Sequence, residues 1–150
     1  MKAAFWITGM ILKITIFLAL TVASLAFVTV GAAAPEKTIE LASKEGLGDY
    51  LVDQDGMALY YFAEDTPRSG TSSCGDTCTV YWPPFHTGQI VLPMGLSSFD
   101  FSTITREDGL VQITYKGWPL YYYTNDYRAG EIKGHGMYET WFVAGPDMMP

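Results

Sequence analysis

The sequence predicts an all-β domain made of two tandem, pseudo-symmetric repeats of short antiparallel strands. The first observation is an internal repeat. Residues 56–65 (GMALYYFAED) and 117–126 (GWPLYYYTND) carry Gly, Leu, Tyr, Tyr, an aromatic residue and Asp at the same spacing. The second observation is that β-forming runs alternate with Gly- and Pro-rich turns after residue 35, with no helical periodicity. Each copy has only about 50 residues, too few for a comfortable core, so we expect the copies to pack face to face as one domain.

The first 34 residues are typical of an export segment. Lys2 and Lys13 accompany an apolar stretch at 14–30, which the small residues at 31–34 follow directly. This order favours a signal peptide over the alternative, an uncleaved membrane anchor, although about 20 apolar residues suffice to span a bilayer. We therefore expect an exported protein, extracellular or at the cell surface in a periplasm-like space. It would touch the membrane only through this segment, if the segment stays uncleaved.

The rest of the chain is strongly acidic. Only Lys2 and Lys13 of the 9 Lys and Arg residues lie in the first 34 positions, so 7 basic and 16 acidic residues remain, a formal charge of 7 − 16 = −9. Such a charge argues against nucleic acid and anionic membrane surfaces as partners. It suits a soluble extracytoplasmic protein, and it also fits one that meets cations or basic partners. The aromatic content is too high for a disordered chain, so we expect a packed core.

Turn-forming residues set the elements of copy one, about residues 46–86. The D-x-D-G turn that ends at Gly56 joins two β-rich runs and predicts a hairpin. Pro83 and Pro84 end the copy, because proline cannot donate to a β-ladder. The expected elements are a leader at 35–45 with a strand at 37–42, strands at 49–53 and 59–63, a loop at 64–79, a strand at 80–82 and an irregular stretch at 85–96.

Copy two, about residues 106–146, repeats this order. A turn at 106–109 opens it, and Lys116-Gly117 forms the hairpin turn that corresponds to the D-x-D-G turn. Gly145-Pro146 ends the last strand. A strand at 99–105 precedes this copy. Its expected elements are strands at 110–115 and 119–123, a loop at 126–136 and a closing strand at 138–144, and a tail at 147–150 follows.

The two copies resemble the "secreted repeat of unknown function" family, whose members are described as predicted lipoproteins with a Y-x-[FWY]-x-x-D motif. The motif stands here as Tyr60-Tyr61-Phe62-Ala63-Glu64-Asp65 and as Tyr121-Tyr122-Tyr123-Thr124-Asn125-Asp126. The resemblance covers residues 46–146 and implies an exported repeat domain, but it brings no activity. The lipid-attachment cysteine of many members is missing here after the apolar stretch, which speaks against lipidation.

Asp65 and Asp126 are the candidate binding residues of the motif. Each follows the end of a strand, where a carboxylate can accept backbone N–H bonds from its own following loop. The alternative is a cation site, with Asp53 and Asp55 as helpers in copy one. We favour the structural cap, because the motif repeats with the fold unit itself. The residues expected to form the shared core are Tyr60, Phe62, Leu120, Tyr121, Tyr123, Trp82 and Trp141.

Cys74 and Cys78 are the only cysteines. In an exported protein we expect them to form a disulfide, which adds a modest ~2 kcal/mol because the closed loop is short. A redox motif would more usually be C-x-x-C, and a zinc site would need further ligands nearby. Because the bond lies wholly inside copy one, we expect copy two to fold without it.

His86 and His135 are the only histidines, and Met137 could be a soft ligand beside them. The residue order of a blue-copper site is absent, so we expect two surface histidines and no metal, haem or other cofactor. The chain also lacks the G-x-S-x-G, H-E-x-x-H and phosphate-loop motifs, so we do not expect an enzyme.

Three functions remain open. The one we favour is a non-catalytic binding or interaction module whose partner is an extracytoplasmic protein or a small ligand. The first alternative is an accessory of extracytoplasmic redox chemistry, which transfers electrons or binds copper or haem through His, Met and aromatic residues. The second alternative is a carboxylate-dependent hydrolase.

Overall fold

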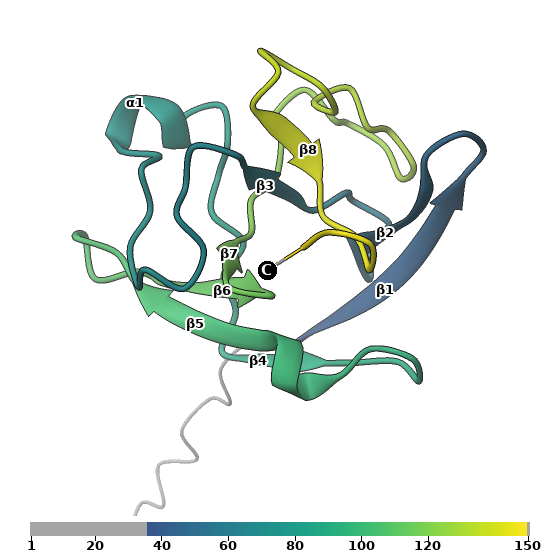
Figure 1. The fold of residues 1–150 in the computed structure, drawn as a ribbon, viewed down its shortest axis with the longest axis horizontal. Coiled ribbons are helices and arrows are strands. Elements are labelled where there is room, and N and C mark those ends of the chain that lie inside the picture. The colour runs from purple at the N-terminus through teal and green to yellow at the C-terminus, as the bar shows by residue number, and fades with distance from the viewer. Residues whose placement is uncertain (1–35, 150) are drawn as a thin grey trace, which may run out of the picture. The chain divides into compact units, whose positions relative to one another are not determined.

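The computed structural model describes residues 36–149, and this part of the chain consists almost entirely of strands and turns (Figure 1). The all-β prediction is therefore confirmed. The strands are β1 (Glu36–Lys44), β2 (Gly48–Asp53), β3 (Tyr60–Phe62), β4 (Gln89–Val91), β5 (Phe101–Thr105), β6 (Val111–Tyr115), β7 (Trp118–Pro119) and β8 (Trp141–Val143). Two short helices complete the described elements, α1 (Asp76–Thr79) and the 3-10 turn η1 (Ser98–Asp100). The export segment at 1–34 lies outside the described residues.

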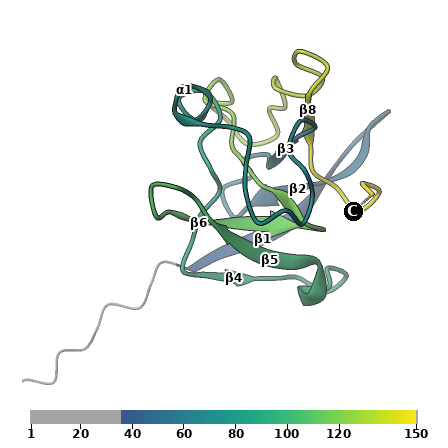
Figure 2. The same ribbon diagram turned by 60° about the vertical axis from the view of Figure 1, so that its left-hand side comes forward.

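The strands form three small sheets with the orders β2-β1-β4, β5-β6-β7 and β3-β8. Both views show β3 and β8 on one side of this domain, with β1, β4, β5 and β6 on the other (Figures 1 and 2). The segment that we expected as a leader contains β1, which pairs antiparallel with β2 and parallel with β4. Ile39 of β1 is fully buried, so this segment is part of the core.

The two copies exchange strands. In copy one, the motif strand β3 pairs with β8 of copy two, with Phe62 opposite Trp141. In copy two, the corresponding motif residues bond to the end of copy one: Tyr122 N donates to Pro83 O at 2.8 Å, and Thr124 N donates to Tyr81 O at 3.0 Å. The copies therefore interlock, and our expectation of two halves packed face to face is corrected in this respect.

Tyr60 and Tyr121 lie at the centre of this exchange. Each donates its backbone N–H to the carbonyl of the other, at 2.8 and 2.9 Å. The next hydrogen bonds outward are also related in pairs: Ala144 N to Leu59 O at 2.8 Å, and Phe85 N to Leu120 O at 2.7 Å. The backbone thus follows a pseudo-twofold axis that passes between the two first tyrosines of the motif.

The core has two parts. One cluster holds the aromatic residues Tyr60, Tyr121, Tyr123, Trp82 and Trp141, all buried, and Phe62 packs against it half-buried. Leu120 belongs to the other cluster, which corrects the single shared core that we expected. The reason is the alternation of side chains along an extended chain, which sends Leu120 to the opposite face from Tyr121.

The expected strand at 80–82 is wrong. The helix α1 forms directly before this stretch, and the disulfide joins Cys78 within α1 to Cys74, which precedes the helix. Tyr81 N and Trp82 N both donate to Cys78 O at 3.0 Å, so the chain leaves α1 through a turn. Trp82 is still buried, as its place in the core requires.

Two further boundaries differ from expectation. The stretch at 85–96 is not wholly irregular, because β4 forms by parallel pairing with the start of β1, a partner more than 50 residues away in sequence. The closing strand begins only at Trp141, since Tyr138 and Glu139 have φ angles of 55° and 57°, which a strand cannot adopt.

Candidate functional site

The motif residues of the two copies bind each other reciprocally. Tyr60 Oη donates to Asp126 Oδ2 at 2.5 Å, and Tyr121 Oη donates to Asp65 Oδ2 at 2.7 Å. All four residues are buried. Each copy of the Y-x-[FWY]-x-x-D motif is therefore completed by the other copy, not by its own aspartate.

The second oxygen of each aspartate holds the loop that follows it. Asp65 Oδ1 accepts from Ser73 N at 2.5 Å, and Asp126 Oδ1 accepts from Lys133 N at 2.9 Å. This is the geometry of a loop cap, as the sequence suggested. Sequence reasoning missed the tyrosine partners, because spacing along one copy says nothing about contacts with the other.

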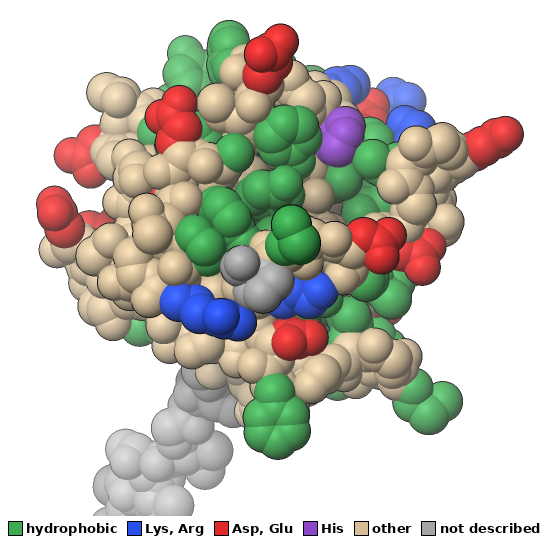
Figure 3. All heavy atoms as spheres, in the orientation of Figure 1, with side chains coloured by type: hydrophobic (Ala, Val, Ile, Leu, Met, Phe, Trp, Pro, Cys, Tyr) green, Lys and Arg blue, Asp and Glu red, His purple; other side chains and the backbone are tan. Residues whose placement is uncertain are grey.

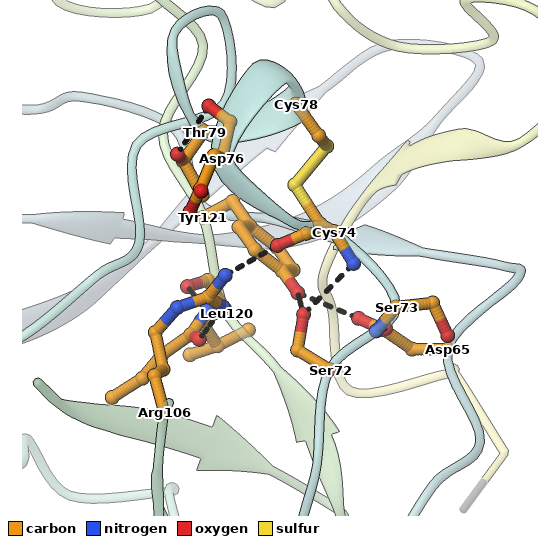
Figure 4. Close-up of a disulfide and its surroundings, with 11 residues drawn as sticks. Asp65, Ser72, Ser73, Cys74, Asp76, Cys78, Thr79, Arg106, Leu120 and Tyr121 are labelled. Carbon is orange, nitrogen blue, oxygen red and sulfur yellow. Dashed lines mark hydrogen bonds between the residues drawn. A yellow bond between two sulfur atoms is a disulfide. The ribbon is translucent and has the colours of Figure 1, made fainter. Parts of the chain in front are cut away.

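The surroundings of the two pairs differ in one respect. Tyr121 Oη also lies 2.6 Å from Ser72 Oγ (Figure 4), whereas Tyr60 Oη accepts a bond from Gly134 N at 3.3 Å.

Burial raises the pKa of Asp65 and Asp126, although the hydrogen bonds that they accept oppose this. Burial, together with the neighbouring carboxylate, also raises the pKa of Tyr60 and Tyr121 far above the usual 10.0. The tyrosines therefore remain protonated donors.

A stack of four aromatic rings lies beside these pairs. The order is Phe62, Trp141, Trp82, Tyr123, with centroid distances of 4.4, 3.8 and 4.3 Å and interplanar angles of 16°, 3° and 25°. The two tryptophans, one from each copy, form the centre of the stack. Edge-to-face contacts with Tyr60 and Tyr121 join the stack to the Tyr–Asp pairs.

Cys74 and Cys78 form a disulfide with their Cα atoms 5.2 Å apart. The surrounding loop is held by copy two: Arg106 donates to the Cys74 carbonyl and to Gln112 Oε1, and Tyr121 contacts Ser72 (Figure 4). The bond itself lies inside copy one, as expected, but the loop that carries it also contacts copy two. A hollow of about 320 Å³, which we call the disulfide hollow, lies between residues 71–79 of this loop and the turn at 105–108.

A second hollow lies at another junction between the two copies. There the loop that follows the copy-two motif meets the start of copy one. This hollow measures about 180 Å³, and we call it the Tyr61 hollow. Its lining includes Asp49, Tyr61, His135, Phe142 and Asp147. Sequence reasoning did not single out Tyr61 or Phe142, since either could have faced the core.

The remaining candidate ligands do not gather. His135 is exposed, and its Nδ1 accepts from Val143 N at 3.2 Å, while His86 lies exposed after Phe85 and Met137 is half-buried against the aromatic cluster. Asp53 is occupied by its own turn and by Tyr122 Oη at 2.7 Å. Within residues 36–149, no three His, Cys, Asp or Glu side chains come together as a metal site would need.

The fold and the reciprocal pairs define a tandem repeat domain whose two copies are interdependent. A family model described as "secreted repeat of unknown function" matches residues 42–86 and 102–145. The chain belongs to this family of secreted repeat proteins, as its motif suggested. No curated protein and no solved structure matches the chain. Over residues 36–149, no helix has the length and apolar character needed to cross a membrane.

Proposed function

We propose that this secreted domain is a non-catalytic binding module whose ligand contacts come from its loops, not from its motif. The observation that carries this proposal is the burial of the motif. The exposed fractions of Tyr60, Tyr121, Asp65 and Asp126 are 0%, 0%, 4% and 6%, and their polar atoms bond to one another. Side chains engaged in this way hold the scaffold together and leave little to offer a ligand.

The two hollows support this division of roles. Each lies where a loop of one copy meets the other copy, so the scaffold builds the same kind of concave junction twice. The disulfide hollow is lined by hydroxyls, Arg106 and several carboxylates, whereas the Tyr61 hollow is lined by aromatic rings, His135 and two carboxylates. Loops on a rigid scaffold are the usual carriers of binding residues.

Amide NMR titrations of the exported protein test the proposal. The probes are small ions and neutral molecules: tetramethylammonium, acetate, inorganic phosphate and glucose. We expect at least one probe to shift amides of residues 71–79 and 105–108, or of residues 47–49 and 135–148, without being consumed. Shifts centred on Tyr60 and Tyr121, turnover of a probe, or no response in any loop would contradict the proposal.

A role in extracytoplasmic electron transfer is the second candidate, and the ring stack favours it. Tryptophan and tyrosine are among the side chains that are oxidised by one electron, and Trp82 and Trp141 stack at 3.8 Å in one buried cluster. A photogenerated ruthenium(III) complex would remove one electron from this stack. If the stack conducts, a radical should reach Tyr123 in the unchanged protein and fail to do so in Trp82→Phe. The same yield in both proteins would rule this role out.

A further inference from the structure

We propose that the Tyr61 hollow binds a substituted ammonium ion, such as a quaternary amine or the ammonium group of a basic side chain. This inference rests on the proposed binding function and names its ligand class. Four features of the protein support it: the aromatic wall, the carboxylates, the state of the nearby cations, and an ammonium group held at the equivalent tyrosine of copy two.

Aromatic rings form one wall of the hollow. The Tyr61 and Phe142 rings lie 5.8 Å apart and are tilted by 32°, and the Trp118 ring follows at 5.1 Å from Tyr61. All three side chains are half-buried, and Tyr61 and Phe142 line the hollow. Figure 3 shows hydrophobic side chains gathered at the centre of one face, with a histidine, carboxylates and Lys or Arg side chains around them. Ring faces of this kind attract cations.

Two carboxylates border the same hollow. Asp49 and Asp147 both line it. Asp147 Oδ2 lies close to Gly48, the residue before Asp49, since a Cβ built on that glycine would be 3.9 Å away from it. Among residues 36–149, neither carboxylate has a hydrogen bond or an ion pair. Two free carboxylates beside aromatic rings provide both parts of an ammonium site.

The nearby basic groups leave these carboxylates available. Lys116 Nζ donates to the carbonyls of Pro146 and Met148, so it is directed at the C-terminal tail. Burial and the charge of Lys44 lower the pKa of His135, and its Nδ1 accepts from Val143 N, so the ring is neutral near neutral pH. Asp49 and Asp147 then carry the negative charge of the hollow, and the positive charge that acts on His135 is that of Lys44.

The equivalent tyrosine of copy two already holds an ammonium group. Tyr122 corresponds to Tyr61 (122 − 61 = 61), and Lys37 Nζ lies 4.9 Å from the centroid of its ring and 5.5 Å from that of Phe85. Lys37 Nζ also donates to Tyr122 Oη at 2.8 Å, which in turn donates to Asp53 at 2.7 Å. Around this copy-two tyrosine, the protein thus combines an ammonium group from the segment before copy one with a ring and a carboxylate of copy one.

Copy one has no internal ammonium at this place. The first hairpins of the copies are offset by 62 (Ile113 against Leu51), so the residue that corresponds to Lys37 is Phe99 (37 + 62 = 99). The Phe99 side chain is 97% exposed and carries no charge. The place that Lys37 fills beside Tyr122 is therefore left without a charge beside Tyr61, where the second ring and the carboxylates of the hollow are those of Phe142, Asp49 and Asp147.

The test is a titration of the exported protein with tetramethylammonium chloride, followed through the ring signals of Tyr61, Phe142 and His135. Sodium chloride holds the ionic strength constant, and tert-butanol is the neutral probe of nearly the same shape. We expect saturable shifts with tetramethylammonium and none with tert-butanol. Equal responses to both probes, or shifts confined to the disulfide hollow, would overturn the proposal.

Matched variants locate the site. Tyr61→Leu should weaken binding about 2- to 5-fold, the size of one exposed cation–π contact. Tyr138→Leu, at an exposed tyrosine that does not line the hollow, should leave binding unchanged. Asp49→Asn combined with Asp147→Asn should weaken it about 10-fold, whereas Asp108→Asn in the disulfide hollow should not. Unchanged affinity in the double carboxylate variant, which alters only exposed side chains, would refute the site even if Tyr61→Leu failed to fold.

The outcome separates this inference from the binding function itself. If tetramethylammonium fails to bind but acetate, phosphate or glucose shifts loop amides, the ammonium site is wrong and the binding module stands. If no probe shifts any loop amide, both proposals are wrong.

Discussion

At the scale of single residues, the two Tyr–Asp pairs have similar geometry but should differ in how far they tolerate substitution of the aspartate. Both tyrosines donate to a buried aspartate of the other copy. Tyr121 has Ser72 Oγ as a second partner, but the second partner of Tyr60 is the Gly134 N–H, which is itself a donor. The hydroxyl hydrogen of Tyr60 therefore has only Asp126 as its acceptor, whereas that of Tyr121 can turn to Ser72.

This difference predicts unequal effects of two matched substitutions. In Asp126→Asn, the side-chain oxygen can keep the bond from Lys133 N, but the amide NH2 then faces Tyr60 and leaves its hydroxyl without an acceptor. Such a buried unsatisfied group costs about 1–3 kcal/mol of unfolding free energy. Asp65→Asn should cost less than about 1 kcal/mol, since Tyr121 can donate to Ser72. Urea unfolding of both variants measures the difference, and equal losses would contradict this account.

His135 gives a prediction for the pH dependence of stability. Burial and Lys44 lower its pKa in the folded protein below the ordinary 6.5, so the unfolded chain binds a proton more readily. Its contribution to stability is thus complete above the unfolded pKa and is lost as the pH falls through the lower folded value. The melting temperature of the unchanged protein should fall more than that of His135→Gln between about pH 7 and about pH 5. Parallel curves would show that His135 has no part in this dependence.

At the scale of elements, local turns could be predicted from sequence and distant pairings could not. The hairpin predicted at Lys116-Gly117 forms as β6-β7, because its two strands are neighbours in the chain. The turn before Gly56 forms as well, but it leaves only one bridge, between Val52 and Ala58, and β3 pairs with β8 instead. The pairing of β3 with β8 joins residues about 80 positions apart, and no local pattern encodes it. At residues 80–82, β-forming side chains suggested a strand, but the disulfide and α1 determine the conformation.

The disulfide loop gives a prediction at this scale. Because Arg106 and Tyr121 of copy two hold the loop, replacing both cysteines by serine should lower the stability of the whole domain by ~2 kcal/mol. Amide hydrogen exchange should become faster in both copies, near Cys74 and near Tyr121 alike. Mass spectrometry under non-reducing conditions first checks that the unchanged protein carries the bond. Faster exchange restricted to residues 64–82 would show that the loop belongs to copy one alone.

At the scale of the whole molecule, the two copies of the sequence repeat are related by a pseudo-twofold axis in the structure. The constant offset between the two motif copies predicted the repeat, and the aromatic residues of both copies predicted much of the core. Interlocking could not be foreseen, since a repeat is compatible both with two separate halves and with two halves that exchange strands. Ser72, Arg106 and Tyr61 contact residues of the other copy only because the copies exchange strands, so the sequence could not predict these contacts.

The central claim is that each motif is completed by the other copy, and a pair of double-mutant cycles tests it most directly. Tyr60→Phe is combined with Asp126→Ala across the copies and with Asp65→Ala within copy one, and urea unfolding gives each coupling free energy. The account predicts a coupling of about 1–3 kcal/mol for Tyr60 with Asp126 and no more than about 0.5 kcal/mol for Tyr60 with Asp65. Equal couplings, or a larger one within copy one, would contradict it.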